Sequence, residues 1–152
     1  MNIYVETNFV FELVFEQEEH QECEQILSIC ESRSANLIMP AYCLAEPHEK
    51  LIRQARKRRD LKQNLDEELS QLVRTGSYAA RVESIRDIAR LLVQSNEEEK
   101  QRFVYFRDIL MNVVQIIPLT IDILRDAATY EIPYDLTPQD AIVYASVVQH
   151  LR

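Results

Sequence analysis

The segment NIYVETNFVF (residues 2–11) places a polar triplet, Glu6-Thr7-Asn8, between two apolar runs. Residues 2–6 are rich in β-branched and aromatic types, which predicts a short buried strand, and from Asn8 the apolar positions take on helical spacing. Glu6 therefore ends a strand that is otherwise suited to burial. Because a buried charge is costly unless it is compensated, we expect either solvent or a cation at this strand end.

Two more predicted strands follow, ANLIMP at 35–40 and VVQIIPL at 113–119, and helical patterns fill the segments between them. Such alternation is typical of an α/β fold with a central parallel sheet and helices on both faces. Gly76 is the only glycine, which also favours a helix-rich chain. A chain of 152 residues is long enough for one core, so we expect a single domain over 1–152 with a helical excursion at about 58–112.

Two helix starts depend on local signals. Pro47 allows the helix after the second strand to begin near Ala45, where a first-turn proline needs no N–H. Alternatively the helix begins at Ala41 and kinks, which frees the carbonyl of Cys43. Farther along, Ser95 precedes a run of acids and resembles an N-cap, which predicts the start of a separate helix there.

The composition argues against several classes of site. One glycine cannot supply the GxGxxG or GxxxxGK[ST] phosphate loops, which need several glycines at fixed spacing. The three cysteines lack CxxC spacing and the three histidines form no HxxxH pair, so we expect no zinc site. The N-terminus shows no secretion signal and no apolar run is long enough to span a bilayer. We therefore expect a cytoplasmic protein without a membrane partner.

Charge is distributed unevenly along the chain. The net charge is −8, but KLIRQARKRRDLK (50–62) carries a local charge of +6 and leaves −14 for the remainder. A basic block on an acidic body is an electrostatic pattern of nucleic-acid binding, and its candidate phosphate contacts are Lys50, Arg53 and Lys57. The alternative is an ordinary solvated helix face.

A third acid lies at a well-specified helix start. In LTPQDAIVYAS (136–146), Thr137 is the N-cap candidate, Pro138 stands at N1 and Asp140 at N3. Glu46 lies six residues after the end of the second predicted strand. If the strands are parallel, Glu6, Glu46 and Asp140 can all reach the carboxyl edge of the sheet, where ligands gather in such folds.

Three converging carboxylates would need a cation to offset their repulsion. Oxygen-only ligands favour the hard ions Mg²⁺ and Mn²⁺, which activate water and neutralise charge on a phosphodiester. Thr7 and Asn8 would hold a carboxylate or a metal-bound water in place.

Each acid also has a local alternative. Glu6 is then a solvated strand end and Glu46 a partner of the helix dipole, while Asp140 forms a capping box with Thr137. Asp135 would be an alternative third ligand.

The motifs YVETN, PAYCLAEPHEK and LTPQDAIVYAS resemble, in order and spacing, the three acidic motifs of the PIN-domain nucleases. These proteins are metal-dependent ribonucleases, and many bacterial members are toxins of toxin–antitoxin pairs. The resemblance covers residues 2 to about 150 and implies a three-layer α/β/α fold. It assigns Glu6, Glu46 and Asp140 to the three acids and Asn8 to an asparagine that often follows the first.

Two departures from the family pattern affect this assignment. The family normally has Asp where Glu6 stands, and one extra methylene displaces the carboxylate by roughly 1–1.5 Å, an error that can cost about a hundredfold in rate. The family also continues into a further strand and acidic position, whereas this sequence stops at Arg152. We therefore expect a PIN-like sheet without its C-terminal strands, truncated or processed from a longer protein.

Three hypotheses follow from the sequence. The first is a ribonuclease that uses Mg²⁺ or Mn²⁺ to cleave RNA, for which the resemblance implies an antitoxin partner and self-association as a homodimer. The second is a PIN-fold module that binds RNA or a protein without cleaving. The third is a mainly helical interaction protein in which the three acids never meet.

Overall fold

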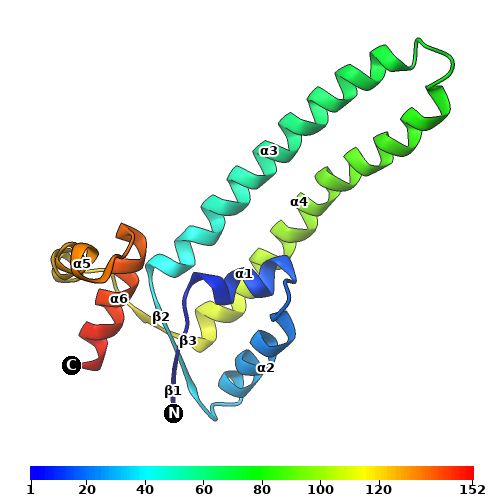
Figure 1. Ribbon diagram of the computed structural model, residues 1–152. Helices are drawn as coiled ribbons and strands as arrows, with labels where there is room; N and C mark the ends of the chain where they lie inside the picture. The colour runs from blue at the N-terminus through cyan, green and yellow to red at the C-terminus, as the bar shows by residue number, and fades with distance from the viewer. The chain divides into compact units, whose positions relative to one another are not determined.

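The structure is a computed structural model, and it describes residues 1–78 and 81–152. The described part of the chain contains three strands and six helices (Figure 1). In chain order they are β1 (Asn2–Tyr4), α1 (Thr7–Phe15), α2 (His20–Glu31), β2 (Asn36–Pro40), α3 (Tyr42–Leu72), α4 (Ala79–Val113), β3 (Val114–Ile117), α5 (Ile121–Tyr134) and α6 (Pro138–Leu151). The predicted helix-rich α/β class is confirmed.

The three strands form one parallel sheet in the order β1-β2-β3. Tyr4 is paired with Ile38, and Ile38 in turn with Gln115. Because all strands run in the same direction, their carboxyl ends meet at one edge of the sheet. The helices α1 and α3 begin at that edge, directly after β1 and β2.

Helices cover both faces of the sheet (Figure 1). On one face Ile38, which has no exposed surface, packs in an apolar cluster with Ile117 and with residues of α5 and α6. The helical members of this cluster are Ile123, Ala127, Ala141 and Ala145, and the alanines allow close approach of the helices. Leu37 and Met39 are buried on the opposite face, as the alternation of a strand requires, and α2 contacts β2.

The first strand is shorter than the predicted 2–6. It ends at Tyr4, although the N–H of Val5 still donates to the carbonyl of Ile38 at 3.0 Å. Glu6 is the N-cap residue of α1 and has an extended backbone, and the N–H of Phe9 donates to its carbonyl. The helix begins earlier than expected because Thr7 and the apolar residues after it are buried together.

Of the two interpretations of Pro47, the structure supports the second. α3 begins at Tyr42, and Pro47 lies inside the helix with its side chain fully buried. The helix thus starts directly after β2, which brings Glu46 into its second turn.

The prediction of a new helix at Ser95 is wrong, because α4 runs without a break from Ala79 to Val113. The hydroxyl of Ser95 donates to the carbonyl of Leu92 at 3.0 Å and accepts from Arg58 of α3 at 3.0 Å. A serine whose hydroxyl is satisfied in this way does not need to cap a helix start.

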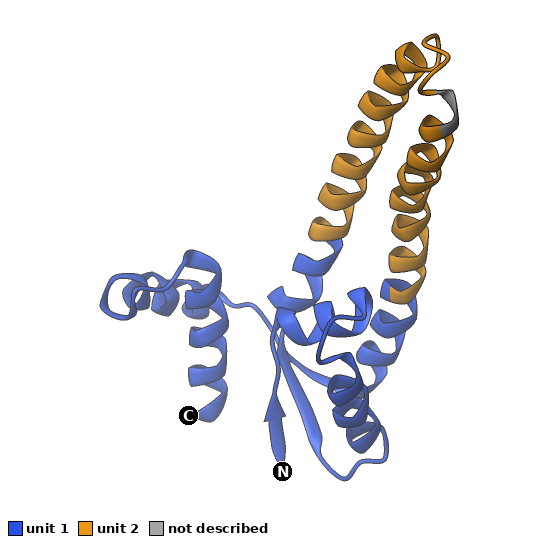
Figure 2. Ribbon diagram, turned by 45° about the vertical axis from the view of Figure 1, so that its right-hand side comes forward, with its two compact units in different colours: residues 1–48, 103–152 blue, residues 49–102 orange. Residues whose placement is uncertain are grey.

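The chain divides into two compact units (Figure 2). The first comprises residues 1–48 and 103–152 and contains the sheet. The second comprises residues 49–102 and consists of the outer parts of α3 and α4, joined by a turn around Gly76. We call this second unit the hairpin. The prediction of one domain over 1–152 stays a prediction.

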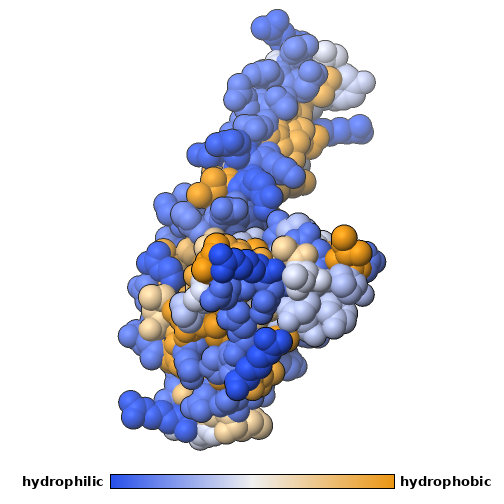
Figure 3. All heavy atoms as spheres, turned by 90° about the vertical axis from the view of Figure 1, so that its left-hand side faces the viewer, coloured by the Kyte–Doolittle hydropathy of each residue, from blue (hydrophilic) through white to orange (hydrophobic). Residues whose placement is uncertain are grey.

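Hydrophilic groups cover most of the face seen in Figure 3, and hydrophobic groups form separate patches between them. In the described part of the chain, no helix combines the length and the apolar character that crossing a membrane requires.

Candidate active site

Thr7 connects the starts of two helices. It is the first residue of α1 and only 5% exposed. Its Oγ1 donates a hydrogen bond of 2.5 Å to Oε2 of Glu46 in α3. This bond holds the Glu46 carboxylate at the carboxyl end of the β1–β2 pair.

Glu6 is held by a neighbour in the same motif. Its side chain is exposed, and Nδ2 of Asn8 donates to Glu6 Oε1 at 2.7 Å. The two residues predicted to support the site, Thr7 and Asn8, thus each bind one of the predicted acids. The glutamate in the first motif has a partner that fixes its longer side chain.

Thr7 relates the two glutamates to each other. Glu6 directly precedes Thr7 in the chain, and Thr7 binds Glu46, so residues 6 and 46 meet at the same edge of the sheet although they are forty positions apart. Cys43 lies beside them. Burial raises the pKa of its thiol, and the carboxylates of Glu6 and Glu46 raise it further, while side-chain and backbone hydrogen bonds with Thr7 act in the opposite direction.

Cys43 was not among the predicted site residues, because buried free cysteines are ordinary core residues. Its position gave one usable signal. It lies three residues before Glu46, so both side chains project from one face of the helix that follows β2.

Asp140 stands at N3 of α6, exposed at the helix start. Its N–H donates to Thr137 Oγ1 at 3.2 Å, and the Thr137 hydroxyl is 2.7 Å from Asp140 Oδ2. The predicted cap is therefore present, and it occupies one carboxylate oxygen. The next residue, Ala141, packs with Ile38 and Ile117, which fixes the start of α6 against the sheet.

Asp135, the alternative third ligand, ends α5, and its place as a ligand stays a prediction. It is the C-cap residue of α5 and takes the left-handed conformation, with φ 51° and ψ 43°. Its N–H donates to carbonyls of the last helical turn. The position is explained by the helix end that it terminates, because Asp and Asn tolerate this conformation better than most residues.

Within the described residues, none of the three predicted acids has a basic partner. Among residues 1–78 and 81–152, Glu6, Glu46 and Asp140 form hydrogen bonds to neutral side chains but no ion pair with lysine or arginine. Within the same ranges, no three His, Cys, Asp or Glu side chains are gathered as a metal-holding group. The structure thus places Glu6 and Glu46 on either side of Thr7 at one edge of the sheet, and Asp140 at the start of α6.

The donors present suit a hard cation. Carboxylate oxygens are the ligands that Mg²⁺ and Mn²⁺ prefer. Burial raises the pKa of the soft donor nearby, the Cys43 thiol, which disfavours the thiolate that soft metals bind. The residue types at this edge of the sheet therefore fit the Mg²⁺ or Mn²⁺ ion that the sequence predicted.

The basic block does not act as one surface. Arg53 and Lys57 are exposed, whereas Lys50 is half-buried and has contacts of its own. Arg58 points across the hairpin, and its Nη1 donates to Ser95 Oγ, Asn96 Oδ1 and Glu99 Oε2 at 3.0, 3.0 and 2.8 Å. Arg58 is thus a structural residue.

Comparison with family models decides the classification, because the PIN domain model matches residues 3–152. The chain belongs to the PIN-domain family. The resemblance seen in the three motifs is confirmed, and the parallel sheet with helices on both faces is a PIN-like α/β fold. Comparison with curated proteins and with solved structures gave no match.

Proposed function

We propose that this PIN-domain protein is a ribonuclease that depends on Mg²⁺ or Mn²⁺. The observation that carries the proposal is the meeting at one sheet edge of Glu46, which Thr7 binds, and Glu6, which precedes Thr7, with neither acid paired to a lysine or arginine within residues 1–78 and 81–152. An arrangement of like charges without an internal counter-ion favours an external one. A bound divalent ion would supply charge neutralisation and an activated water for attack at phosphorus.

The residues of the chain have separate tasks in this proposal. Glu6 and Glu46 hold the ion, and Asp140 offers the carboxylate oxygen that its cap leaves available. Asn8 and Thr7 orient the two glutamates through their hydrogen bonds. Such orienting partners typically change metal affinity or activity by about 10–100-fold when they are removed.

RNA is the substrate that the family and the charge pattern favour together. Lys50, Arg53 and Lys57 follow one another on α3 at intervals of three and four residues, so they lie along one face of that helix. Cations in such a row attract phosphates and oppose the field of the acidic body. We propose that they guide RNA.

The direct test is cleavage of a mixed-sequence RNA in the presence of Mn²⁺. The wild type should cleave and Asp140→Asn should lose at least about a hundredfold in rate, as expected for a metal ligand. Asp122→Asn is the matched control, because Asp122 also lies exposed in the first turn of a helix and should cleave normally. If the wild type and Asp140→Asn leave the RNA equally intact, the proposal fails.

A second candidate is a PIN-fold module that binds RNA or a protein partner without cleaving. Two observations favour it, namely glutamate in place of aspartate at position 6 and the absence of a three-ligand group within 1–78 and 81–152. RNA binding that is unchanged by Mn²⁺ and by Asp140→Asn would support this candidate.

The toxin role and its partners are separate proposals that come from the family. A toxin should arrest growth when expressed alone, and co-expression of its antitoxin should relieve the arrest. Self-association as a homodimer is measured by sedimentation of the full chain.

A further inference from the structure

The two units differ sharply in charge. Residues 49–102 hold 13 of the 17 lysines and arginines and 10 of the 25 acids, for a net charge of +3. The remainder of the chain, which contains the candidate active site, has a net charge of −11. A polyanion is therefore repelled by the sheet unit taken by itself, and its affinity has to come from the hairpin.

Two hollows lie side by side along the hairpin. The larger, about 820 Å³, is lined by α3 from Arg59 to Gln71, by Arg74 just after that helix, and by Val93 of α4. The smaller, about 300 Å³, adds Arg86 and Arg90 of α4. Both hollows share Lys62, Asp66 and Ser70, so they form one continuous depression, which we call the hairpin groove.

The lining of the groove is polar and rich in donors. Its five basic residues, Arg59, Lys62, Arg74, Arg86 and Arg90, outnumber its two acids, Asp66 and Glu67, and the side chains of Gln63, Ser70 and Gln71 add neutral donors. Val93 is the one apolar residue in the lining described for either hollow. Such a surface suits an anionic, hydrogen-bonding ligand and not an apolar one.

Two of the arginine side chains are without partners among the residues that the structure describes. Arg59 and Arg74 are exposed, and their side chains form no hydrogen bond or ion pair within 1–78 and 81–152. Arg59 lies on α3 and Arg74 in the turn that follows it, and both line the larger hollow. They therefore offer two separate cationic contacts to one extended ligand.

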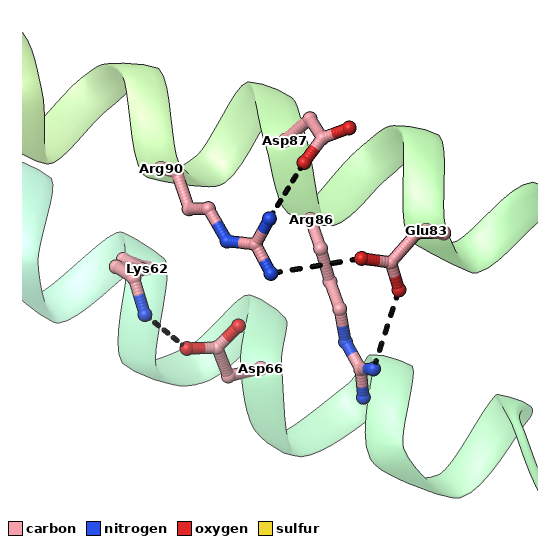
Figure 4. A network of polar contacts seen from close by, with 6 residues as sticks. All are labelled: Lys62, Asp66, Glu83, Arg86, Asp87 and Arg90. Carbon is pink, nitrogen blue, oxygen red and sulfur yellow. Dashed lines mark hydrogen bonds and ion pairs between the residues drawn. The ribbon is translucent and has the colours of Figure 1, made fainter.

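The other basic side chains of the groove, Lys62, Arg86 and Arg90, form ion pairs with neighbouring carboxylates (Figure 4). Lys62 pairs with Asp66, and Arg90 contacts Asp87 at 2.8 Å and Glu83 at 3.6 Å. Arg86 is 3.7 Å from Glu83. The Arg90, Asp87 and Glu83 side chains are each at least 60% exposed, and exposed pairs of this kind contribute little stability. Phosphates can therefore replace the carboxylates at small cost.

We propose that the hairpin groove binds the phosphate backbone of single-stranded RNA. The choice of RNA rests on the proposed ribonuclease function, and the groove is separate from the row of Lys50, Arg53 and Lys57 proposed above. Arginine is suited to this role because its planar fork matches phosphate oxygens, and phosphates repeat along a strand as the cations are distributed along the groove.

The test is RNA binding by the full chain in EDTA, where metal-dependent cleavage cannot occur. Arg59→Gln/Arg74→Gln removes the two unpaired arginines of the groove. Arg33→Gln/Arg125→Gln removes the same charge from the sheet unit and is the matched control. Fluorescence anisotropy of a labelled single-stranded RNA, titrated at several salt concentrations, gives the affinity and its salt dependence. Thermal unfolding of each variant confirms that it folds.

The groove variant should bind about tenfold or more weakly, and its slope of log K against log salt should be smaller by about 1.4, as for the loss of two phosphate contacts on a single strand. The control should keep both values. Equal affinity and slope in the groove variant, or no RNA binding by the wild type, would overturn the proposal. So would competition by polyglutamate as effective as that by RNA, which would indicate an acidic protein partner.

These outcomes are separable from those of the ribonuclease proposal. If the protein binds RNA through the groove but does not cleave it in Mn²⁺, the ribonuclease proposal is wrong and the groove proposal stands. If the groove variant cleaves RNA and binds it as the wild type does, the groove proposal is wrong and the ribonuclease proposal stands.

Discussion

Oγ1 of Thr7 donates a hydrogen bond of 2.5 Å to Oε2 of Glu46, a residue 39 positions farther along the chain. The bond joins the first residue of α1 to the second turn of α3 at the carboxyl edge of the sheet. A buried hydroxyl that is bonded to a carboxylate is sensitive to substitution, so this pair offers the first test of the account.

Thr7→Val keeps the shape of the side chain and removes the hydroxyl. Glu46 then loses its 2.5 Å partner, and we expect Mn²⁺ affinity and RNA cleavage to fall about 10–100-fold. The free energy of unfolding should fall by about 1–2 kcal/mol, as for a lost hydrogen bond to a charged group. Thr7→Ser should restore most of both. Thr129→Val on α5, which removes an exposed hydroxyl bonded to a carbonyl, is the control and should not affect metal binding.

Glu6→Asp tests whether the site has adapted to the longer side chain. Shortening the residue draws its carboxylate back from Nδ2 of Asn8, which it now meets at 2.7 Å. We expect the cleavage rate to fall up to about a hundredfold, because positioning errors of this size are that costly. Glu24→Asp, an exposed change on α2, should leave the rate as it is. A Glu6→Asp enzyme faster than the wild type would show that glutamate handicaps the site.

Arg58→Met tests the pairing that closes the hairpin. Arg58 contacts Glu99 at 2.8 Å, and their side chains are only 20% and 10% exposed. Removal of the arginine leaves Glu99 buried without its counter-ion, and the free energy of unfolding should fall by about 3 kcal/mol. Adding Glu99→Leu should recover much of the loss. Arg56→Met, an exposed neighbour, should change the stability by less than about 0.5 kcal/mol in urea unfolding.

The three cysteines give a prediction for the alkaline range. Burial raises the pKa of Cys23, Cys30 and Cys43 above the ordinary value of 9.0. The folded state therefore keeps these thiols protonated when the unfolded chain has lost the protons. The associated stability is complete below pH 9.0 and is lost as the pH rises through the higher folded values.

Thiolate absorbance measures this difference directly. In the native protein it should rise at a higher pH than in urea, and the free energy of unfolding should be smaller above pH 9.0 than below it. Identical thiolate titrations in the two states would contradict the raised pKa values.

The fold was largely predictable from sequence because its signals are local. Short apolar runs predicted the three strands, and the Thr137-Pro138 start predicted α6. The prediction of a helix start at Ser95 failed because a serine caps a helix only when its hydroxyl has no other partner. Here Arg58 of the facing helix binds that hydroxyl, and the local sequence does not contain that information.

The site was predictable in part for the same reason. Strand ends and helix starts indicated Glu6, Glu46 and Asp140, and the fold does join the first two motifs through the bond from Thr7 to Glu46. The contacts of Cys43 and the inward turn of Arg58 depend on packing between segments far apart in the chain, so the sequence could not reveal them. The cap of Asp140 was visible locally and is present as expected.

The most direct test of the central claim is a titration with Mn²⁺, monitored by loss of the electron paramagnetic resonance signal of the free ion. The wild type should bind Mn²⁺, and Glu46→Gln and Asp140→Asn should each weaken binding at least about tenfold. Asp135→Asn, at the neighbouring helix end, should bind as the wild type does. If the wild type binds no Mn²⁺, or if all four proteins bind it equally well, these carboxylates do not hold a metal ion together.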